Sequence, residues 1–183
     1  MNLSELISKA KEYRACETEL NKLRRFSSVE EALKSNKAPY WCYWYAAEVI
    51  DGRWIEGEPV ILTSARYSYW YSICPVKDRW VEAEPIILTS DKYSYNYALN
   101  VIKGRWLKAE PVILTDPEYS YCYARNVIQG RWLKAEPIIL TNAYFSYLYA
   151  SNVLHGRWIK AESIISTDNY VKNLYEAFLE SVN

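Results

Sequence analysis

A tryptophan recurs every 26 residues along most of this chain, and this spacing constrains the fold more than any other feature. The sequence around it repeats as well: YSYNYALNVIKGRWLKAEPVILTD begins at Tyr93, and YSYCYARNVIQGRWLKAEPIILTN begins at Tyr119. A period of this length corresponds to one supersecondary unit that buries its apolar surface only against its neighbours. The chain therefore contains five tandem copies of one unit, marked by Trp54, Trp80, Trp106, Trp132 and Trp158.

Each copy begins with the pattern of a capped helix. In the fourth copy, Asp116 is a good N-cap residue, and Pro117 follows at the first helical position, where its missing N–H removes no bond. Gly130 is expected to be the left-handed residue that ends the helix, so the pattern predicts a helix over residues 117–129. The equivalent N-cap residues are Ser64, Ser90, Asn142 and Asp168, and the equivalent glycines are Gly52, Gly104 and Gly156.

The second element of each copy begins at the tryptophan and runs through WLKAEPIILT. A strand is possible for the short branched stretch PVILT. The period leaves too little room for a strand crossover, however, and Lys-Ala-Glu favours a helix. We expect a helix of about ten residues with a proline near its first turn, where proline is tolerated. These prolines are Pro59, Pro85, Pro111 and Pro137.

Both ends of the chain carry apolar residues at helical spacing, as capping helices would. The N-terminal set is Leu3, Leu6, Ile7, Ala10 and Tyr13. Ser28 then begins a short helix through Leu33, and residues 168–181 form an amphipathic closing helix. The sequence thus predicts an all-α fold, an α-solenoid of five 26-residue helix-turn-helix repeats. It comprises N-terminal capping helices in 1–38, repeats in 39–167 and a C-terminal capping helix in 168–183, as one continuous domain.

The second copy departs from the pattern. Pro75 replaces the valine of the other copies, Cys74 replaces an asparagine or glutamate, and Asp78 replaces the glycine. Because a proline inside a helix removes a hydrogen bond and clashes with the preceding turn, we expect the helix to break or kink near Ile73.

Comparison of the five copies separates fixed positions from variable ones. Positions 13, 11 and 9 before each tryptophan are aromatic, and those 12 and 8 before it are small, as packing between repeats would require. Positions 14, 10, 7 and 3 before it vary freely and fall on one helical face. We call this set the variable face. Its candidate partner-binding residues are Tyr40, Trp44, Arg66, Trp70, Ile73, Asn96, Leu99 and Leu148.

Trp44 and Trp70 lie one repeat apart and, with Tyr40, form the preferred hot spot, because exposed aromatic residues are costly to leave in water. Two alternatives stay open. The face varies simply because solvent does not constrain it, or the N-terminal helix folds across the two tryptophans and buries them.

The other recurring polar residues are read as structural. Every copy has an arginine directly before the tryptophan and a glutamate four residues after it, as in Arg131 and Glu136. An active site is needed once, so a pair that recurs five times indicates a charge-assisted contact between helices. Asn100, Asn126 and Asn152 are expected to bond a turn backbone, and His155 is expected at the surface. The sequence therefore predicts no catalytic residue, no metal site and no cofactor.

Composition excludes several classes of protein. Lys and Arg number 22, as do Asp and Glu, so the chain lacks the positive charge of a typical nucleic-acid binder. The four cysteines are widely spaced and form no metal-ligand pattern, which suits a reducing cytoplasm. No apolar run approaches the roughly 20 residues of a membrane span, and the N-terminus has no signal-peptide core. We expect a cytoplasmic protein without membrane contact.

The unit YSYxYAxNVIxGRWxKAEPxIL, which covers roughly Tyr40 to Thr167, resembles the Tyr-rich tandem repeats with GRW and AEP cores in phage and bacterial proteins. The resemblance implies a helical-repeat scaffold and is compatible with a phage origin, but it identifies no functional residue. In architecture alone, the chain is similar to TPR and Sel1-like arrays, which are adaptors.

Together these features predict a non-enzymatic scaffold that binds a protein. If the chain is phage-encoded, the expected partner is a host protein, such as a defence component that it inhibits in the host cytoplasm. Two alternatives from other classes stay open. One is a protein that sequesters a nucleotide or small nucleic acid between Tyr or Trp and Arg. The other is a structural role in which arrays pack end to end.

Overall fold

The computed structural model describes residues 2–182 and is all-helical, which confirms the predicted fold class. Consecutive helices pair as the units of an α-solenoid do. The chain forms two compact units, one ending at Ile87 and the other beginning at Leu88. The proposed division into caps and one continuous array stays a prediction.

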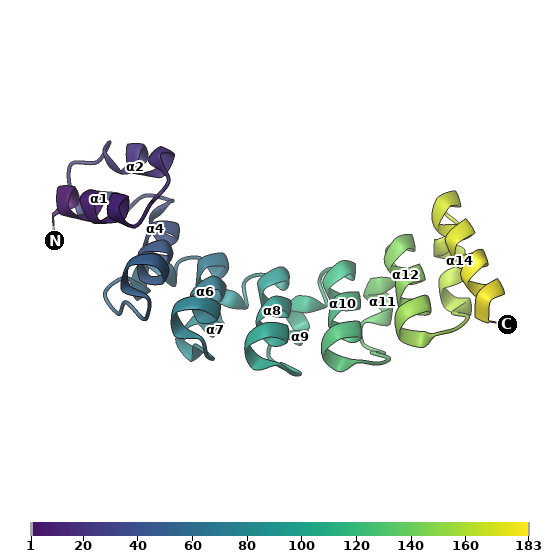
Figure 1. The fold of residues 1–183 in the computed structure, drawn as a ribbon. Helices are drawn as coiled ribbons and strands as arrows, with labels where there is room; N and C mark the ends of the chain where they lie inside the picture. The colour runs from purple at the N-terminus through teal and green to yellow at the C-terminus, as the bar shows by residue number, and fades with distance from the viewer. Residues whose placement is uncertain (1, 183) are drawn as a thin grey trace. The chain divides into compact units, whose positions relative to one another are not determined.

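The N-terminal unit holds the first capping helices and two repeats. Apolar residues at helical spacing lie in the first helix, as predicted, and Tyr13 is its C-cap. Figure 1 shows α1 and α2 next to each other. The elements are α1 (Leu3–Glu12), α2 (Glu17–Leu23), α3 (Val29–Ala32), α4 (Ala38–Trp44), η1 (Tyr45–Ile50), α5 (Glu58–Ile61), α6 (Ala65–Tyr71), η2 (Ser72–Val76), η3 (Val81–Ala83) and α7 (Glu84–Ile87).

The C-terminal unit holds three repeats and the closing helix. Figure 1 shows α8, α10, α12 and α14 side by side in one layer, with α9 and α11 behind them. The elements are α8 (Asp91–Tyr97), η4 (Ala98–Ile102), α9 (Glu110–Ile113), α10 (Pro117–Tyr123), η5 (Ala124–Ile128), α11 (Glu136–Ile139), α12 (Ala143–Tyr149), η6 (Ala150–Leu154), η7 (Ile159–Ala161), α13 (Glu162–Ile165) and α14 (Asn169–Val182).

The predicted N-caps lie where the sequence placed them. The Asp116 carboxylate accepts hydrogen bonds from the backbone N–H groups of Glu118 and Tyr119, at 2.8 and 3.1 Å. Ser28, Ser90, Asn142 and Asp168 cap their helices in the same way. Ser64 occupies the N-cap position, but its side chain makes no capping bond. These caps fix where each first helix begins.

The second half of each first helix is a π-helix, not an α-helix. In the fourth repeat, α10 gives way at Ala124 to η5, in which backbone N–H groups bond to carbonyls five residues earlier. The helix therefore spans 117–128, one residue short of the predicted 117–129, and its second half differs in kind.

The prediction that glycine is the left-handed residue is wrong. Each π-segment ends at the residue before the glycine position, and this residue has φ between 53° and 58°. The N–H of Gln129 closes the turn onto Ala124, and Gly130 adds a second bond to the same carbonyl at 3.2 Å. All five glycines lie within the described residues, and none has a positive φ. The left-handed residues are Asp51, Lys77, Lys103, Gln129 and His155.

The break predicted at Pro75 is also wrong. Pro75 lies inside η2, and Lys77 closes that segment in the left-handed conformation, as in the other repeats. The change from α to π geometry occurs eight residues before the tryptophan in four repeats and one residue earlier in the first, so the proline does not cause it. Pro75 occupies a place where the α-helical hydrogen-bond ladder has already ended.

The second element of each repeat is shorter than the ten residues predicted. Its regular part is one four-residue turn, such as α11, with the proline at the second position. A turn or a short 3-10 helix precedes it, because the backbone of the tryptophan is extended; Trp80 has φ −109° and ψ 92°. The extended residue allows the chain to reverse between the two layers of the repeat.

Neighbouring repeats are joined by a tyrosine hydroxyl. Tyr123 is fully buried, its ring packs on Trp132 of its own repeat, and its hydroxyl accepts the backbone N–H of Trp106 in the preceding repeat at 2.7 Å. The same bond links Trp54 to Tyr71 and Trp132 to Tyr149. In each case the bond pairs a backbone N–H with a tyrosine hydroxyl, and both groups are costly to bury without a partner. We call this set of contacts the seam.

The closing helix continues the seam. Tyr175 on α14 lies 26 residues after Tyr149, and its hydroxyl accepts the backbone N–H of Trp158 at 2.7 Å. A small residue completes each junction: Ser146 is fully buried and donates to the carbonyl of Ile139 at 3.0 Å. The last repeat is therefore capped by the contact that joins the repeats to one another.

We predict that Tyr123→Phe destabilises the protein by about 1–3 kcal/mol, because the buried N–H of Trp106 loses its acceptor. Tyr144→Phe removes a hydroxyl from an exposed ring and serves as the control, with an expected change within about 0.5 kcal/mol. Urea denaturation followed by circular dichroism measures both. Equal stability of the two variants would show that the hydroxyl bond contributes nothing to the seam.

Candidate interaction surfaces

The variable face lies at the surface in both units. Each of its twenty residues is exposed or partially exposed, whereas the aromatic and small residues of the seam are largely buried. The fixed and variable positions inferred from the five copies therefore correspond to the inside and the outside of the first-helix layer. Whether this face binds a partner stays a prediction.

In the N-terminal unit, aromatic and cationic side chains of the variable face lie close together. Trp70 is 41 % exposed, a large value for tryptophan, and its ring contacts Tyr69 at 5.2 Å between centroids. The Arg66 guanidinium carbon lies 5.4 Å from the centroid of the Tyr67 ring. The ring of Tyr40, in the first repeat, packs on the same Tyr67 ring with 5.7 Å between centroids. These contacts hold the exposed groups in place before any partner arrives.

Trp44 has a different environment. It is partially exposed, and its ring lines a cavity together with Leu6 and Ala10 of α1. The N-terminal helices therefore lie against Trp44 but leave Trp70 open. Trp44 and Trp70 thus differ in their surroundings, and whether they act as one hot spot stays a prediction. Ile73 is partially exposed on η2.

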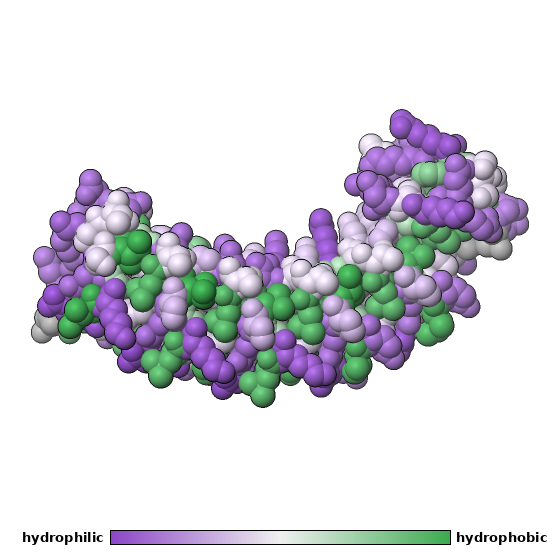
Figure 2. All heavy atoms as spheres, turned by 180° about the vertical axis from the view of Figure 1, so that it is seen from behind, coloured by the Kyte–Doolittle hydropathy of each residue, from purple (hydrophilic) through white to green (hydrophobic). Residues whose placement is uncertain are grey.

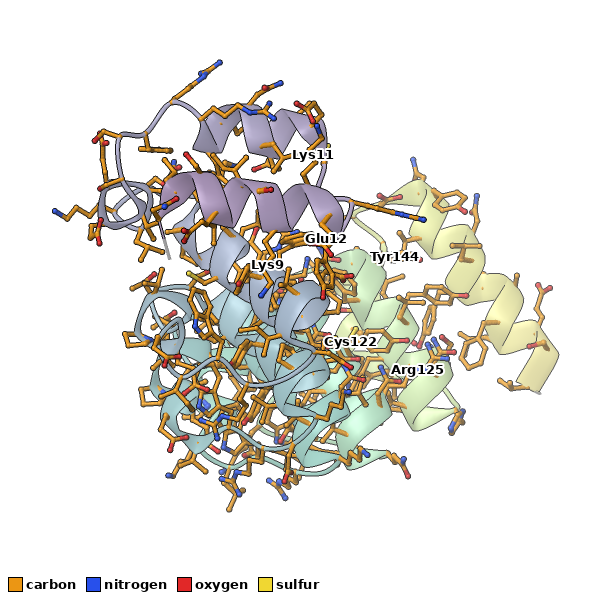
Figure 3. All side chains as sticks on the ribbon, turned by 60° about the vertical axis from the view of Figure 1, so that its left-hand side comes forward. Lys9, Lys11, Glu12, Cys122, Arg125 and Tyr144 are labelled. Carbon is orange, nitrogen blue, oxygen red and sulfur yellow. The ribbon has the colours of Figure 1, made fainter. Side chains whose placement is uncertain are left out.

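In the C-terminal unit, the predicted residues are spread over several helices. Asn96 and Leu99 lie on α8 and η4 and are partially exposed, while Leu148 lies on α12, beyond α10. Figure 3 shows Cys122 and Arg125 on α10 and η5 and Tyr144 on α12. This part of the face is more mixed in polarity than the part around Trp70.

The recurring Arg and Glu residues are structural, as predicted. Each pair makes an ion pair of 2.5–2.8 Å from the arginine Nε to a glutamate oxygen. In the fourth repeat, Glu136 is buried while about half of the Arg131 side chain is exposed. The buried carboxylate at the start of the second element is thus neutralised by an arginine that still reaches water.

Asn126 and Asn152 bond tyrosine hydroxyls, not a turn backbone as expected. Asn126 donates to the hydroxyl of Tyr95 at 2.8 Å, and Asn152 donates to that of Tyr121 at 3.0 Å. Each bond crosses from one repeat to the preceding one. Sequence comparison could not reveal these partners, because the two residues lie 31 positions apart and meet only when the repeats stack.

A set of exposed aliphatic residues was not predicted from the sequence. The residue directly after each tryptophan is Ile, Val or Leu in every repeat and is 58–74 % exposed. An aliphatic residue at this position in all five copies could have identified the row, but we expected the position to lie within a helix. Figure 2 shows apolar side chains that reach the surface between hydrophilic ones in each unit. We call these residues the aliphatic row: Ile55, Val81, Leu107, Leu133 and Ile159.

Charge changes along this row. The exposed residue that follows each aliphatic one is a glutamate in the N-terminal unit, at Glu56 and Glu82. It is a lysine in the C-terminal unit, at Lys108, Lys134 and Lys160. The two units therefore present aliphatic residues beside charges of opposite sign.

The chain matches no known family, curated protein or solved structure. Its function must therefore be inferred from its own surfaces.

Within residues 2–182, no helix is both long and apolar enough to cross a membrane. In the same part of the chain, no three His, Cys, Asp or Glu side chains gather as a metal-binding group. The four cysteines are free thiols, and burial raises the pKa of Cys42 to about 12. His155 is exposed, as expected.

Tyr71 lies beside Trp70 in the sequence and joins the first two repeats. Its hydroxyl accepts the N–H of Trp54 at 2.6 Å and donates to Glu58 at 3.0 Å. Burial and the Glu58 carboxylate together raise the pKa of Tyr71 from 10.0 to about 12, burial being the larger cause. Tyr71 thus stays neutral in the folded protein at a pH where it ionises in the unfolded chain.

We predict that this difference in pKa makes the protein lose stability between pH 10 and 12. Because the folded-state pKa is the higher one, the contribution is fully present below pH 10 and falls as the pH rises toward 12. Denaturation at several pH values in this range measures the fall, and Tyr71→Phe is expected to make it shallower. A curve for Tyr71→Phe parallel to that of the wild type would contradict the assignment.

Proposed function

We propose that this protein is a non-enzymatic scaffold that binds a protein partner through the variable face of its N-terminal unit. The observation that carries the proposal is the exposure of Trp70 among ordered aromatic and cationic neighbours. Tryptophan, tyrosine and arginine are the residue types that dominate binding energy at protein interfaces. An exposed tryptophan that is held in place costs little further entropy when a partner covers it.

The repeat architecture supports the same function. The seam uses the aromatic and small positions for packing, so the variable positions are free to differ without loss of the fold. Stacked helices present such positions as an extended surface, which is how repeat proteins bind macromolecules. The proposed contact residues are Tyr40, Arg66, Trp70 and Ile73.

The chemistry of this face indicates the kind of partner. Trp70 and Ile73 require an apolar surface, and Arg66 favours a carboxylate or a carbonyl beside it. Trp44 contributes only its exposed part, since α1 lies against the remainder. If the chain comes from a phage, as its repeat motif suggests, the partner is a host protein that it modulates.

We predict that Trp70→Ala weakens partner binding about tenfold or more, the loss typical of a hot-spot residue. Tagged wild type and variant are used to recover partners from cells of the native host, and quantitative mass spectrometry compares them. Tyr170→Ala is the matched control, because Tyr170 is an aromatic residue on α14, is 69 % exposed and lies outside the variable face. A partner retained by Tyr170→Ala and lost by Trp70→Ala supports the proposal.

Equal recovery by all three proteins would show that this face is not the binding surface. A thermal-shift screen with nucleotides and short RNAs tests the sequestering alternative. A shift that disappears in Arg66→Ala, without any protein partner, would replace protein binding by nucleotide binding.

A second candidate function is self-assembly, and the aliphatic row favours it. Ile55 and Val81 stand beside glutamates, whereas Leu107 and Leu133 stand beside lysines. The aliphatic residues and glutamates of one copy's N-terminal unit are therefore complementary to the aliphatic residues and lysines of another copy's C-terminal unit. A contact between these two different surfaces would join copies of the chain. It would give the chain a structural role.

Under self-assembly, Glu82→Lys or Lys108→Glu is expected to weaken dimer formation about tenfold, because like charges then face each other. The double variant exchanges the charges and should restore the dimer. Sedimentation equilibrium at low ionic strength measures all four proteins. A wild type that is monomeric at every concentration would eliminate this candidate without affecting the partner-binding proposal.

A further inference from the structure

The N-terminal unit encloses a cavity of about 170 Å³. Its wall comes from α1–α3 on one side and from the first repeat on the other. Aliphatic side chains, including Leu6, Leu20 and Val29, supply the first side, and the indole rings of Trp41, Trp44 and Trp54 supply much of the second. Lys9, Lys11 and Glu12, which are exposed on α1, do not line it (Figure 3). The space is therefore apolar and rich in aromatic surface.

Trp54 differs from the equivalent tryptophans of the other repeats. Trp80, Trp106, Trp132 and Trp158 are 1–5 % exposed, whereas Trp54 is only partially buried and borders the cavity. Its ring still packs on Tyr45 of its own repeat at 5.1 Å between centroids, as the others pack on their own tyrosines. The first repeat thus keeps the ring contact of the seam but opens one side of its tryptophan.

Gly57 explains this difference. A Cβ atom placed on Gly57 would lie 2.3 Å from Cε3 of Trp54, so the ring occupies the space of a missing methyl group. The other repeats have alanine at this position, and in each it is fully buried. The backbone turn after the tryptophan is the same with glycine and with alanine. The Gly57 N–H donates to the Trp54 carbonyl at 3.0 Å, and the Ala109 N–H donates to the Trp106 carbonyl at 2.9 Å. The tryptophans of the other repeats cannot adopt the position of Trp54.

The size of the cavity suits a small ring. An engineered cavity of about 150 Å³ lined by apolar side chains stays dry and binds benzene. Aromatic walls add favourable stacking or edge contacts with a flat molecule. The cavity is thus large enough for a compact aromatic molecule and offers it contact on several sides.

The polar groups at the wall select against anions. Glu19 accepts hydrogen bonds from Lys22 and from Nε1 of Trp41, and both bonds hold the pKa of this carboxyl below its usual range. Glu56 also lines the cavity. Two carboxylates at the rim and no cation among the lining residues would repel a negatively charged ligand.

We propose that this cavity is a binding site for an uncharged aromatic molecule of one or two rings, and that Gly57 shapes it by setting the position of Trp54. This proposal does not depend on partner binding at Trp70. Of the residues proposed for that contact, Tyr40 lines the cavity, whereas Arg66, Trp70 and Ile73 do not. The site lies at the first repeat, where α1–α3 take the place of a preceding repeat.

The test is a titration of the full chain with benzene, indole and benzoate. Binding is followed by ¹H–¹⁵N spectra of the tryptophan indole groups, with Trp41 and Trp54 identified by substitution. Benzene or indole should give saturable shifts at these two residues, and benzoate, which has the ring of benzene and a negative charge, should bind at least tenfold more weakly.

Two variants locate the site. Gly57→Ala introduces the residue that the other repeats carry, so the fold should persist, and it is expected to weaken indole binding at least tenfold. Ala15→Leu fills the cavity from the loop between α1 and α2 and should have the same effect. Ala109→Gly, the converse change in the third repeat, is the control and should leave binding unchanged. Thermal melting verifies that each variant is folded.

Absence of saturable shifts with both benzene and indole would overturn the proposal and identify the cavity as a packing defect. Wild-type affinity in folded Gly57→Ala and Ala15→Leu would also overturn it, because the ligand would then bind elsewhere. Tighter binding of benzoate than of benzene would refute the assigned ligand class.

Discussion

The bond from a tryptophan backbone N–H to a tyrosine hydroxyl in the following repeat or the closing helix is the contact on which the rest of the structure depends. Its donors are Trp54, Trp106, Trp132 and Trp158. The tryptophan must be extended for the chain to reverse, so its N–H has no helical partner. The tyrosine supplies that partner from the next repeat and fills the junction with a ring that packs on its own tryptophan. One side chain thus satisfies a buried donor, fills the seam and fixes the spacing between repeats.

This seam determines which surfaces are free for function. It uses the aromatic and small positions, most of which are buried, and an Arg–Glu ion pair within each repeat holds the start of the second element. Two sets of residues lie outside it: the variable face on the first helices and the aliphatic row after the tryptophans. The first differs from repeat to repeat and suits recognition of a particular partner. The second keeps an aliphatic residue in every repeat, and the charged residue that follows it is glutamate in one unit and lysine in the other, which suits contact between copies.

The first repeat shows how a small departure from the pattern creates a different site. Its preceding neighbour is a set of capping helices, which do not supply the contacts of a repeat. Because Gly57 replaces alanine, the ring of Trp54 occupies the place of the missing methyl group and borders the cavity. Trp44 lines the same cavity. The same tryptophan that closes the core in the other repeats here borders a cavity. Trp70 does not line this cavity and is more exposed than Trp44, which is why the proposal of partner binding centres on it.

The sequence by itself determined the repeat, the all-helical fold, the N-caps and the division into fixed and variable positions, because these follow from a period and from local chemistry. The boundaries of the first helices and the exposure of Trp70 were predictable for that reason. Only the tertiary structure decided the π-geometry before Gln129, the partners of Asn126 and the position of Trp54. Asn126 and its partner Tyr95 lie 31 positions apart and meet only when the repeats stack. The other two features depend on how the backbone of one turn bonds and packs against the next, which residue type alone does not fix.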